Sequence, residues 1–187
     1  ETAPGGMAAI LALDAATVDA ICAEVRALTG GVVQVANYNS PGQVVISGDD
    51  ASLAQALELA KTRGARKSMR LPISIAAHSP LMAPAAAEMS RAIIATDLKP
   101  PQLPVISNIT AQPLTSVDEI RRELVGQLTA GVRWEDSVRM MAEQGVGLFI
   151  EVGAGSVLTG LVKRIVKESG TLSVGDAAGI EQLRALV

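Results

Sequence analysis

The sequence predicts an α/β protein, and two observations support this prediction. Short segments rich in β-branched residues alternate with segments whose apolar residues recur at helical spacing. Hydrophobic residues make up 49% of the 187 residues and aromatic residues only 2%, so the core must consist of small aliphatic side chains. Such a core suits helices packed on a sheet better than an aromatic-rich β-sandwich. The length allows one large domain or two small ones.

Residues 7–71 are predicted to form a ferredoxin-like βαββαβ subdomain. Its expected strands and helices are, in chain order, Met7–Leu13, Ala15–Leu28, Val32–Asn37, Gln43–Ser47, Ala51–Arg63 and Arg66–Leu71. Asp14 is the expected N-cap of the first helix, and Gly30 follows its end. The stretch 39–42 consists of strong turn formers and separates the two central strands.

Residues 72–187 are expected to form part of an α/β layer whose remaining strands lie outside the chain. Leu71–Ile75 is predicted to be a buried strand that runs into Ala76 and Ala77. The later elements are a helix from Pro80 to about Ala95, a strand Pro104–Ser107, a loop Asn108–Pro113, helices Val117–Thr129 and Trp134–Gln144, a buried strand Gly147–Val152, a helix Ser156–Glu168, a strand Thr171–Val174 and a helix Ile180–Val187. Ser116 and Glu119 are expected to form a capping box.

Composition and charge exclude several classes of function. The net charge is -3 and the basic residues are scattered, so the chain has no electrostatic footprint for nucleic acid. One histidine and one cysteine do not make a credible metal site. Cys22 lies on the apolar side of its helix, which favours a buried, inert thiol over a nucleophile. No apolar run approaches the roughly 18 residues that cross a bilayer, and a single cysteine fits a reducing, cytoplasmic compartment.

His78 is the only histidine, and it is expected at a corner where a strand gives way to a helix. Imidazole is well suited to proton transfer near neutral pH, so His78 is a candidate general base. The alternative is a corner histidine that merely binds a carbonyl. No GxSxG elbow occurs, so a nucleophile served by His78 would lie outside this sequence. The chain also starts without Met and runs from Glu1 straight into a strand, so we expect a fragment.

The turn at 153–155, Gly-Ala-Gly, follows a strand and opens a helix, as a phosphate-binding loop would. A dinucleotide fingerprint would need a third glycine where Leu158 stands. A Walker loop would need a lysine where Leu161 follows Gly160. We therefore expect close packing of strand and helix at this turn; the alternative is that its amides contact a ligand.

Several motifs together resemble the C-terminal portion of the malonyl-CoA:acyl carrier protein transacylases. They are Asn37–Gly48 (NYNSPGQVVISG), Leu71-Pro72, His78-Ser79, Leu81-Met82, Pro104–Asn108, Gln127-Leu128, Val132–Trp134, Phe149–Gly155 and Leu158–Leu161. The resemblance spans essentially the whole chain. It implies an α/β-hydrolase-like large subdomain, with its C-terminal part at residues 72–187, that carries the ferredoxin-like small one.

The resemblance also implies the chemistry. A serine on a GHSxG elbow attacks malonyl-CoA, His78 takes its proton, and the main-chain carbonyl of Gln127 orients the imidazole. The malonyl group then passes to the phosphopantetheine thiol of acyl carrier protein, in fatty acid biosynthesis. Asn37, Asn39 and Asn108 match positions near the substrate cleft, although turn chemistry is an equal explanation for Asn39. No cofactor is implied, since the coenzyme A thioester is a substrate.

The sequence departs from the family pattern by lacking three functional features. The elbow serine, the arginine that pairs with the malonyl carboxylate and the N-terminal oxyanion loop are absent from the sequence. The expected partners are therefore malonyl-CoA, acyl carrier protein and the missing N-terminal part of the same enzyme, with no nucleic acid and no membrane. The chain alone is expected to be inactive. Two alternatives remain open, an acyltransferase domain fragment of a polyketide synthase and a non-catalytic ferredoxin-like binding module.

Overall fold

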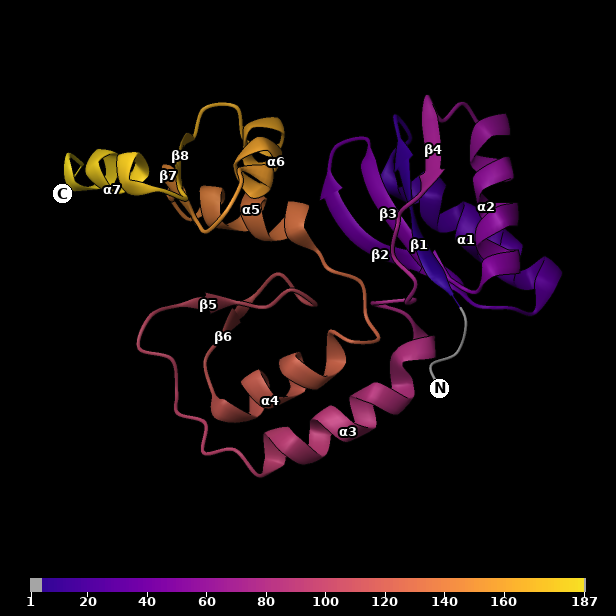
Figure 1. Ribbon diagram of the computed structural model, residues 1–187, viewed down its shortest axis with the longest axis horizontal. Coiled ribbons are helices and arrows are strands. Elements are labelled where there is room, and N and C mark those ends of the chain that lie inside the picture. Colours follow the sequence, from indigo (N-terminus) through magenta and orange to yellow (C-terminus); the bar gives the residue numbers. More distant parts are fainter. Residues whose placement is uncertain (1–4, 187) are drawn as a thin grey trace. The chain divides into compact units, whose positions relative to one another are not determined.

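The computed structural model describes residues 5–186 and confirms an α/β fold (Figure 1). The chain divides into two compact units, of which the first ends at Trp134 and the second begins at Glu135. The boundary predicted after residue 71 falls inside the first unit. The first residues, on which the expectation of a fragment rests, lie outside the described part, as does Val187 at the end of the predicted last helix.

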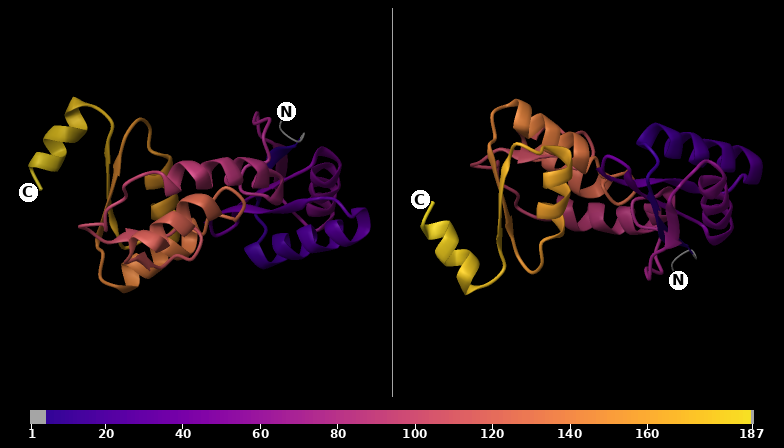
Figure 2. Two further views of the ribbon diagram at one scale, coloured as in Figure 1. Left: turned by 90° about the horizontal axis from the view of Figure 1, so that it is seen from below. Right: turned by 90° about the horizontal axis from the view of Figure 1, so that it is seen from above.

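The first unit begins with a four-stranded antiparallel sheet in the order β2-β3-β1-β4. Its strands are β1 (Gly6–Leu11), β2 (Val33–Ser40), β3 (Gln43–Gly48) and β4 (Lys67–Arg70). The helices α1 (Ala15–Thr29) and α2 (Asp50–Thr62) pack on one face of this sheet (Figures 1 and 2). The elements follow one another as β-α-β-β-α-β, the order expected from the sequence.

The main core lies between this sheet and its two helices. Every second residue of the central strands points into it, as the period of a strand requires. Its buried members include Ala8, Ile10, Val18, Ile21, Val33, Val35, Val44, Ile46, Leu53 and Ala56. Cys22 is 1% exposed, and burial raises the pKa of its thiol to about 12. The expectation that Cys22 is a buried core thiol is confirmed.

The helix ends were predictable from single residues. The Asp14 carboxylate accepts a hydrogen bond from the amide of Thr17 at 2.7 Å, which caps α1. Gly30 ends α1 in the left-handed conformation, with φ of 66°. Asp49 caps α2 and also accepts from the amide of Val32, so one carboxylate joins two turns.

The strand predicted at Leu71–Ile75 is wrong, because this segment forms no strand. Pro72 has no amide hydrogen to donate to a ladder. The amide of Ile73 bonds to the carbonyl of Leu71, which turns the chain instead of extending it. The side chains of Ile73 and Ile75 are 40% and 41% exposed, so the apolar run was not a sign of burial.

The rest of the first unit pairs two helices and a small hairpin. A short 3-10 helix, η1 (Pro80–Met82), leads into α3 (Ala83–Ile94), which packs against α4 (Val117–Gly126) (Figure 1). The hairpin strands β5 (Val105–Ile106) and β6 (Pro113–Leu114) lie between them in the chain. The predicted capping box of Ser116 and Glu119 is present at the start of α4.

The second unit contains a parallel strand pair. The elements are α5 (Trp134–Glu143), which starts at the last residue of the first unit, then β7 (Leu148–Val152), α6 (Val157–Ile165), β8 (Gly170–Val174) and α7 (Ala177–Arg184). The strand over residues 147–152 was expected to be buried, and this is wrong. Leu148, Ile150 and Val152 share one face of β7 and are 41%, 41% and 78% exposed, because α6 covers only the opposite face.

None of the helices in residues 5–186 is long and apolar enough to cross a membrane.

Replacement of Gly48 by Ala should destabilise the first unit by about 3 kcal/mol, because overpacking a tight site costs roughly 1–3 kcal/mol or more. A Cβ at Gly48 would lie 2.0 Å from the carbonyl oxygen of Val32, and backbone atoms cannot rotate away. Urea unfolding followed by circular dichroism measures the loss. Gly147→Ala is the control, since its Cβ would meet no atom within 4 Å. Equal midpoints for both variants would contradict the prediction.

Candidate active site

The His78 corner is built by its neighbours. Ser79 is fully buried, and its hydroxyl donates to the carbonyl of Ala76 at 2.7 Å while it accepts from the amide of Leu81. Ser79 thereby caps η1, and Pro80 supplies the preset φ at its first position. His78 itself has a φ of 58°, a left-handed conformation that costs an L-residue roughly 1–2 kcal/mol. Such strain is often held where function needs a particular side-chain direction.

The imidazole of His78 is oriented by a main-chain carbonyl. Its Nδ1 lies 2.6 Å from the carbonyl oxygen of Gln127, and the side chain is partly buried. A carbonyl oxygen can only accept a hydrogen bond, so Nδ1 must carry the proton in this contact. In the neutral ring, Nε2 then holds a free lone pair and can accept a proton.

The Gln127 carbonyl is available because of its place in α4. Gln127 is the C-cap of that helix, and the last carbonyls of a helix have no partner further along it. The amide of Gln127 donates to the carbonyl of Glu123 at 3.0 Å, which keeps the residue in helical geometry. The helix predicted to reach Thr129 ends at Gly126, and this early end leaves Gln127 at the C-cap.

Gln34 holds the backbone on both sides of this contact, and sequence reasoning missed it. Gln34 lies in β2, and its side-chain nitrogen Nε2 donates to the carbonyl of His78 at 2.6 Å and to that of Thr129 at 3.0 Å. One side chain therefore ties the corner to the segment that follows α4. No sequence signal could have found Gln34, because its partners lie 44 and 95 residues away.

Asn108 joins the group at Gln127. Its side-chain nitrogen Nδ2 donates to Oε1 of Gln127 at 3.2 Å, and its main-chain carbonyl accepts from the backbone amide of Arg133 at 2.7 Å. The residue before Arg133, Val132, forms a bridge with Asn37 of β2. The structure thus brings His78, Gln127 and Asn108 into one connected network, and it places Asn37 beside the same backbone segment.

Asn39 is not drawn into this network. It lies in the irregular end of β2, between two residues whose pairing with β3 is shifted. Over residues 5–186, the side chains of Asn37 and Asn39 make no hydrogen bond, and both are partly buried.

A buried acidic residue stands behind the network and was also missed. Glu123 is 9% exposed, and its carboxylate accepts from the hydroxyl of Ser107 at 2.5 Å and from the amide of Asn108 at 2.9 Å. Its spacing offered a signal, since Glu123 and Gln127 are four residues apart and so share one helix face.

The glycine turn at 153–155 carries no site for an outside phosphate at the start of α6. The carboxylate of Glu151 accepts from the amides of Leu158 and Thr159 at 3.1 and 2.7 Å. These are the amides that an anion would use at a helix N-terminus, and the chain supplies the anion itself. The hydrogen bond from the Thr159 amide lowers the pKa of Glu151.

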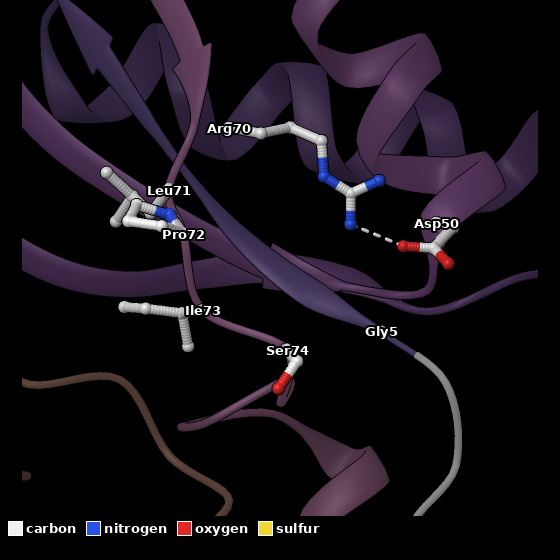
Figure 3. A pocket seen from close by; sticks show the side chains of 7 residues that line it. All are labelled: Gly5, Asp50, Arg70, Leu71, Pro72, Ile73 and Ser74. Atoms are coloured by element: carbon white, nitrogen blue, oxygen red, sulfur yellow. Dashed lines mark hydrogen bonds and ion pairs between the residues drawn. The ribbon is translucent and has the colours of Figure 1, made fainter.

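A hollow of about 530 Å³ lies beside β4, and none of the predicted site residues lines it (Figure 3). It is lined by Gly5, Asp50, Arg70, Leu71, Pro72, Ile73 and Ser74. Arg70 and Asp50 form an ion pair across one side of it, as Figure 3 shows. Within the described residues, no group of three or more His, Cys, Asp or Glu side chains is placed to hold a metal ion.

Comparison with known proteins matches residues 1–184 to the acyl transferase domain family. The malonyl CoA-acyl carrier protein transacylase of Bacillus subtilis (strain 168) is 42% identical over 177 residues, which is 95% of this chain and 56% of that protein. The polyketide biosynthesis protein ThaF of Burkholderia thailandensis is 41% identical over 170 residues, 90% of this chain but 14% of that protein.

A similar solved structure is a malonyl-transacylase in complex with a type II polyketide synthase acyl carrier protein. It matches with a TM-score of 0.95 and 37% identity, over 100% of this chain and 60% of that one. The chain therefore spans little more than half the length of the transacylases that it resembles.

The stability of α6 should depend on pH through Glu151. Because the pKa of Glu151 is lowered in the fold, its stabilisation is complete above about pH 4.3, the ordinary glutamate value, and is lost as the pH falls through the lower folded value. Hydrogen exchange of the α6 amides between pH 6 and 3 measures this loss. In Glu151→Gln, exchange corrected for its intrinsic pH dependence should lose this acid sensitivity. If both proteins respond to acid alike, Glu151 does not cap α6.

Proposed function

The chain belongs to the acyl transferase domain family, and we propose that it is the C-terminal portion of a malonyl-CoA:acyl carrier protein transacylase. The complete enzyme would transfer a malonyl group from coenzyme A to the phosphopantetheine thiol of acyl carrier protein, in fatty acid biosynthesis in the cytoplasm. This chain supplies the base, and the remainder of the enzyme supplies the serine nucleophile. No cofactor takes part, because the coenzyme A thioester is a substrate.

In the proposed reaction, Nε2 of His78 takes the proton of the serine hydroxyl as the oxygen attacks the thioester carbonyl. The C–S bond then breaks, and the departing coenzyme A thiolate receives that proton. An acyl-serine remains. The thiol of acyl carrier protein gives its proton to His78, attacks the acyl-serine and releases the serine, which is reprotonated.

The observation that carries this proposal is the 2.6 Å contact between Nδ1 of His78 and the Gln127 carbonyl. It holds the proton on Nδ1 and so leaves Nε2 as the basic nitrogen. His78 also has a φ of 58°, and strained backbone of this kind is often held at functional sites. We assign the orienting role to the main chain of Gln127 and not to its side chain.

The asparagines are proposed to line the substrate cleft. Asn108 supports this role best, since it contacts Gln127 directly. Asn37 lies beside the segment that holds Asn108, and Asn39 rests on the resemblance alone. We assign residues 7–71 to a ferredoxin-like small subdomain and residues 72–187 to the C-terminal part of an α/β-hydrolase-like large subdomain.

The N-terminal part of the enzyme is the proposed partner of the exposed β7 face. Parallel sheets are normally covered on both faces, and Leu148, Ile150 and Val152 present an apolar face of β7 that α6 leaves open. Helices of the N-terminal part would cover this face, and its strands would extend the sheet at its edge.

A polyketide synthase acyltransferase domain is the second candidate, favoured by the 41% identity to the ThaF protein. The chemistry of His78 would be the same in both. Sequence beyond this chain separates them, since a polyketide synthase would continue into ketosynthase or carrier modules. A non-catalytic binding module would instead tolerate loss of His78.

On its own, the 187-residue chain should transfer no malonyl group above background, because a base without its nucleophile loses most of the acceleration. Mass spectrometry of holo acyl carrier protein, incubated with malonyl-CoA and the purified chain, measures the transfer. The complete enzyme provides the positive control. Transfer at a comparable rate by the chain alone would show that it contains its own nucleophile.

In the complete enzyme, His78→Ala should lower the rate of malonyl transfer by about 100-fold or more, the usual contribution of a general base. Initial rates at saturating malonyl-CoA measure the effect. Gln127→Ala is the matched variant and should be far milder, since it retains the main-chain carbonyl. Unchanged turnover in His78→Ala would reduce His78 to a structural corner.

A further inference from the structure

We propose that Glu123 is a positioning residue for His78. Its carboxylate holds the backbone of Asn108, and Asn108 holds Gln127, whose carbonyl orients the imidazole. The link to catalysis rests on the proposed function. The link between Glu123 and the imidazole rests on geometry alone and can be measured without any turnover.

The carboxylate of Glu123 is buried. Glu123 and Ser107 are 9% and 1% exposed, and burying an acidic group is costly unless its oxygens are satisfied. Oε2 accepts from the Ser107 hydroxyl at 2.5 Å and Oε1 from the Asn108 amide at 2.9 Å. No ion pair to Glu123 is present among the described residues, so these donors carry the compensation.

This carboxylate also orders the turn between β5 and β6. The Ser107 hydroxyl donates to Glu123 and accepts from the amides of Ile109 and Thr110 at 3.2 and 2.9 Å. The carboxylate thus directs the hydroxyl proton and leaves both lone pairs for the backbone. Through these hydrogen bonds the Glu123 side chain helps to hold residues 107–110 on α4.

Asn108 and Gln127 connect this turn to the imidazole of His78. Asn108, fixed through its amide, donates from its side chain to Oε1 of Gln127 at 3.2 Å. Glu123 and Gln127 are also joined through the backbone of α4, where the Gln127 amide donates to the Glu123 carbonyl. Gln127 is therefore held at both its backbone and its side chain, and its carbonyl faces Nδ1 of His78.

The simpler explanation is that Glu123 only fastens the turn to α4. A purely structural role predicts a loss of stability without a change at the imidazole, whereas a positioning role predicts both. Because His78 is the only histidine in the chain, its ring gives a single set of signals in nuclear magnetic resonance. The ¹⁵N shifts of that ring report which nitrogen carries the proton.

The experiment uses the 187-residue chain with Glu123→Gln and Glu123→Leu. The wild type should show the proton on Nδ1 in the neutral ring. Glu123→Leu should shift the ring towards the Nε2-protonated form. Glu123→Gln should be intermediate, because one oxygen can still accept from Asn108. Glu88→Gln, an exposed glutamate on α3, is the matched charge control, and Leu53→Ala lowers stability from within the distant core.

In the complete enzyme, Glu123→Leu should lower kcat roughly tenfold with little change in KM, since slight misplacement of a reacting group costs up to about 100-fold. Rates are normalised to the folded fraction. If Glu123→Leu loses stability like Leu53→Ala but keeps the wild-type ring signals and kcat, the inference is overturned. If the ring signals change while His78→Ala keeps full turnover, positioning by Glu123 is supported and the proposed function fails.

Discussion

The hydrogen bond between the His78 ring and the Gln127 carbonyl is the constraint on which the site depends. The acceptor is a neutral main-chain group, so it orients the ring and selects its tautomer without the attraction that a carboxylate would add. A carbonyl cannot rotate like a side chain. The direction of the imidazole is therefore set by where α4 ends, and the last turn of that helix becomes part of the site.

Three distant segments converge to support this bond. Gln34 comes from the sheet, Asn108 from the turn between β5 and β6, and Gln127 from the end of α4. Most of the connecting groups are amides or carbonyls, which can be buried at modest cost when each finds a partner. Glu123 is the one charged member, and it lies where two donors converge. Polar networks of this kind act as a unit, so each member influences the rest.

Local rules in the sequence predicted much of the fold and only part of the site. Caps such as Asp14 and Gly30 were predictable because their reasons lie within a few residues. Leu71–Ile75 failed because an apolar run cannot say whether a partner strand exists. His78 was found as the only histidine in the sequence and Gln127 through motif resemblance. Gln34 was missed because its partners are set by tertiary packing. The spacing of Glu123 and Gln127 was visible, but nothing local indicated that the carboxylate is buried.

The left-handed backbone of His78 costs stability, and replacing His78 by glycine would remove the imidazole together with the strain. Ala12 and Ala111 adopt similar angles, with φ of 70° and 55°, and a glycine at either place would relax the chain without discarding any chemistry. Under the proposed function, a glycine at position 78 would relax the backbone but remove the imidazole that acts as the base. Substitutions intended to raise the free energy of unfolding should therefore be placed at positions other than His78.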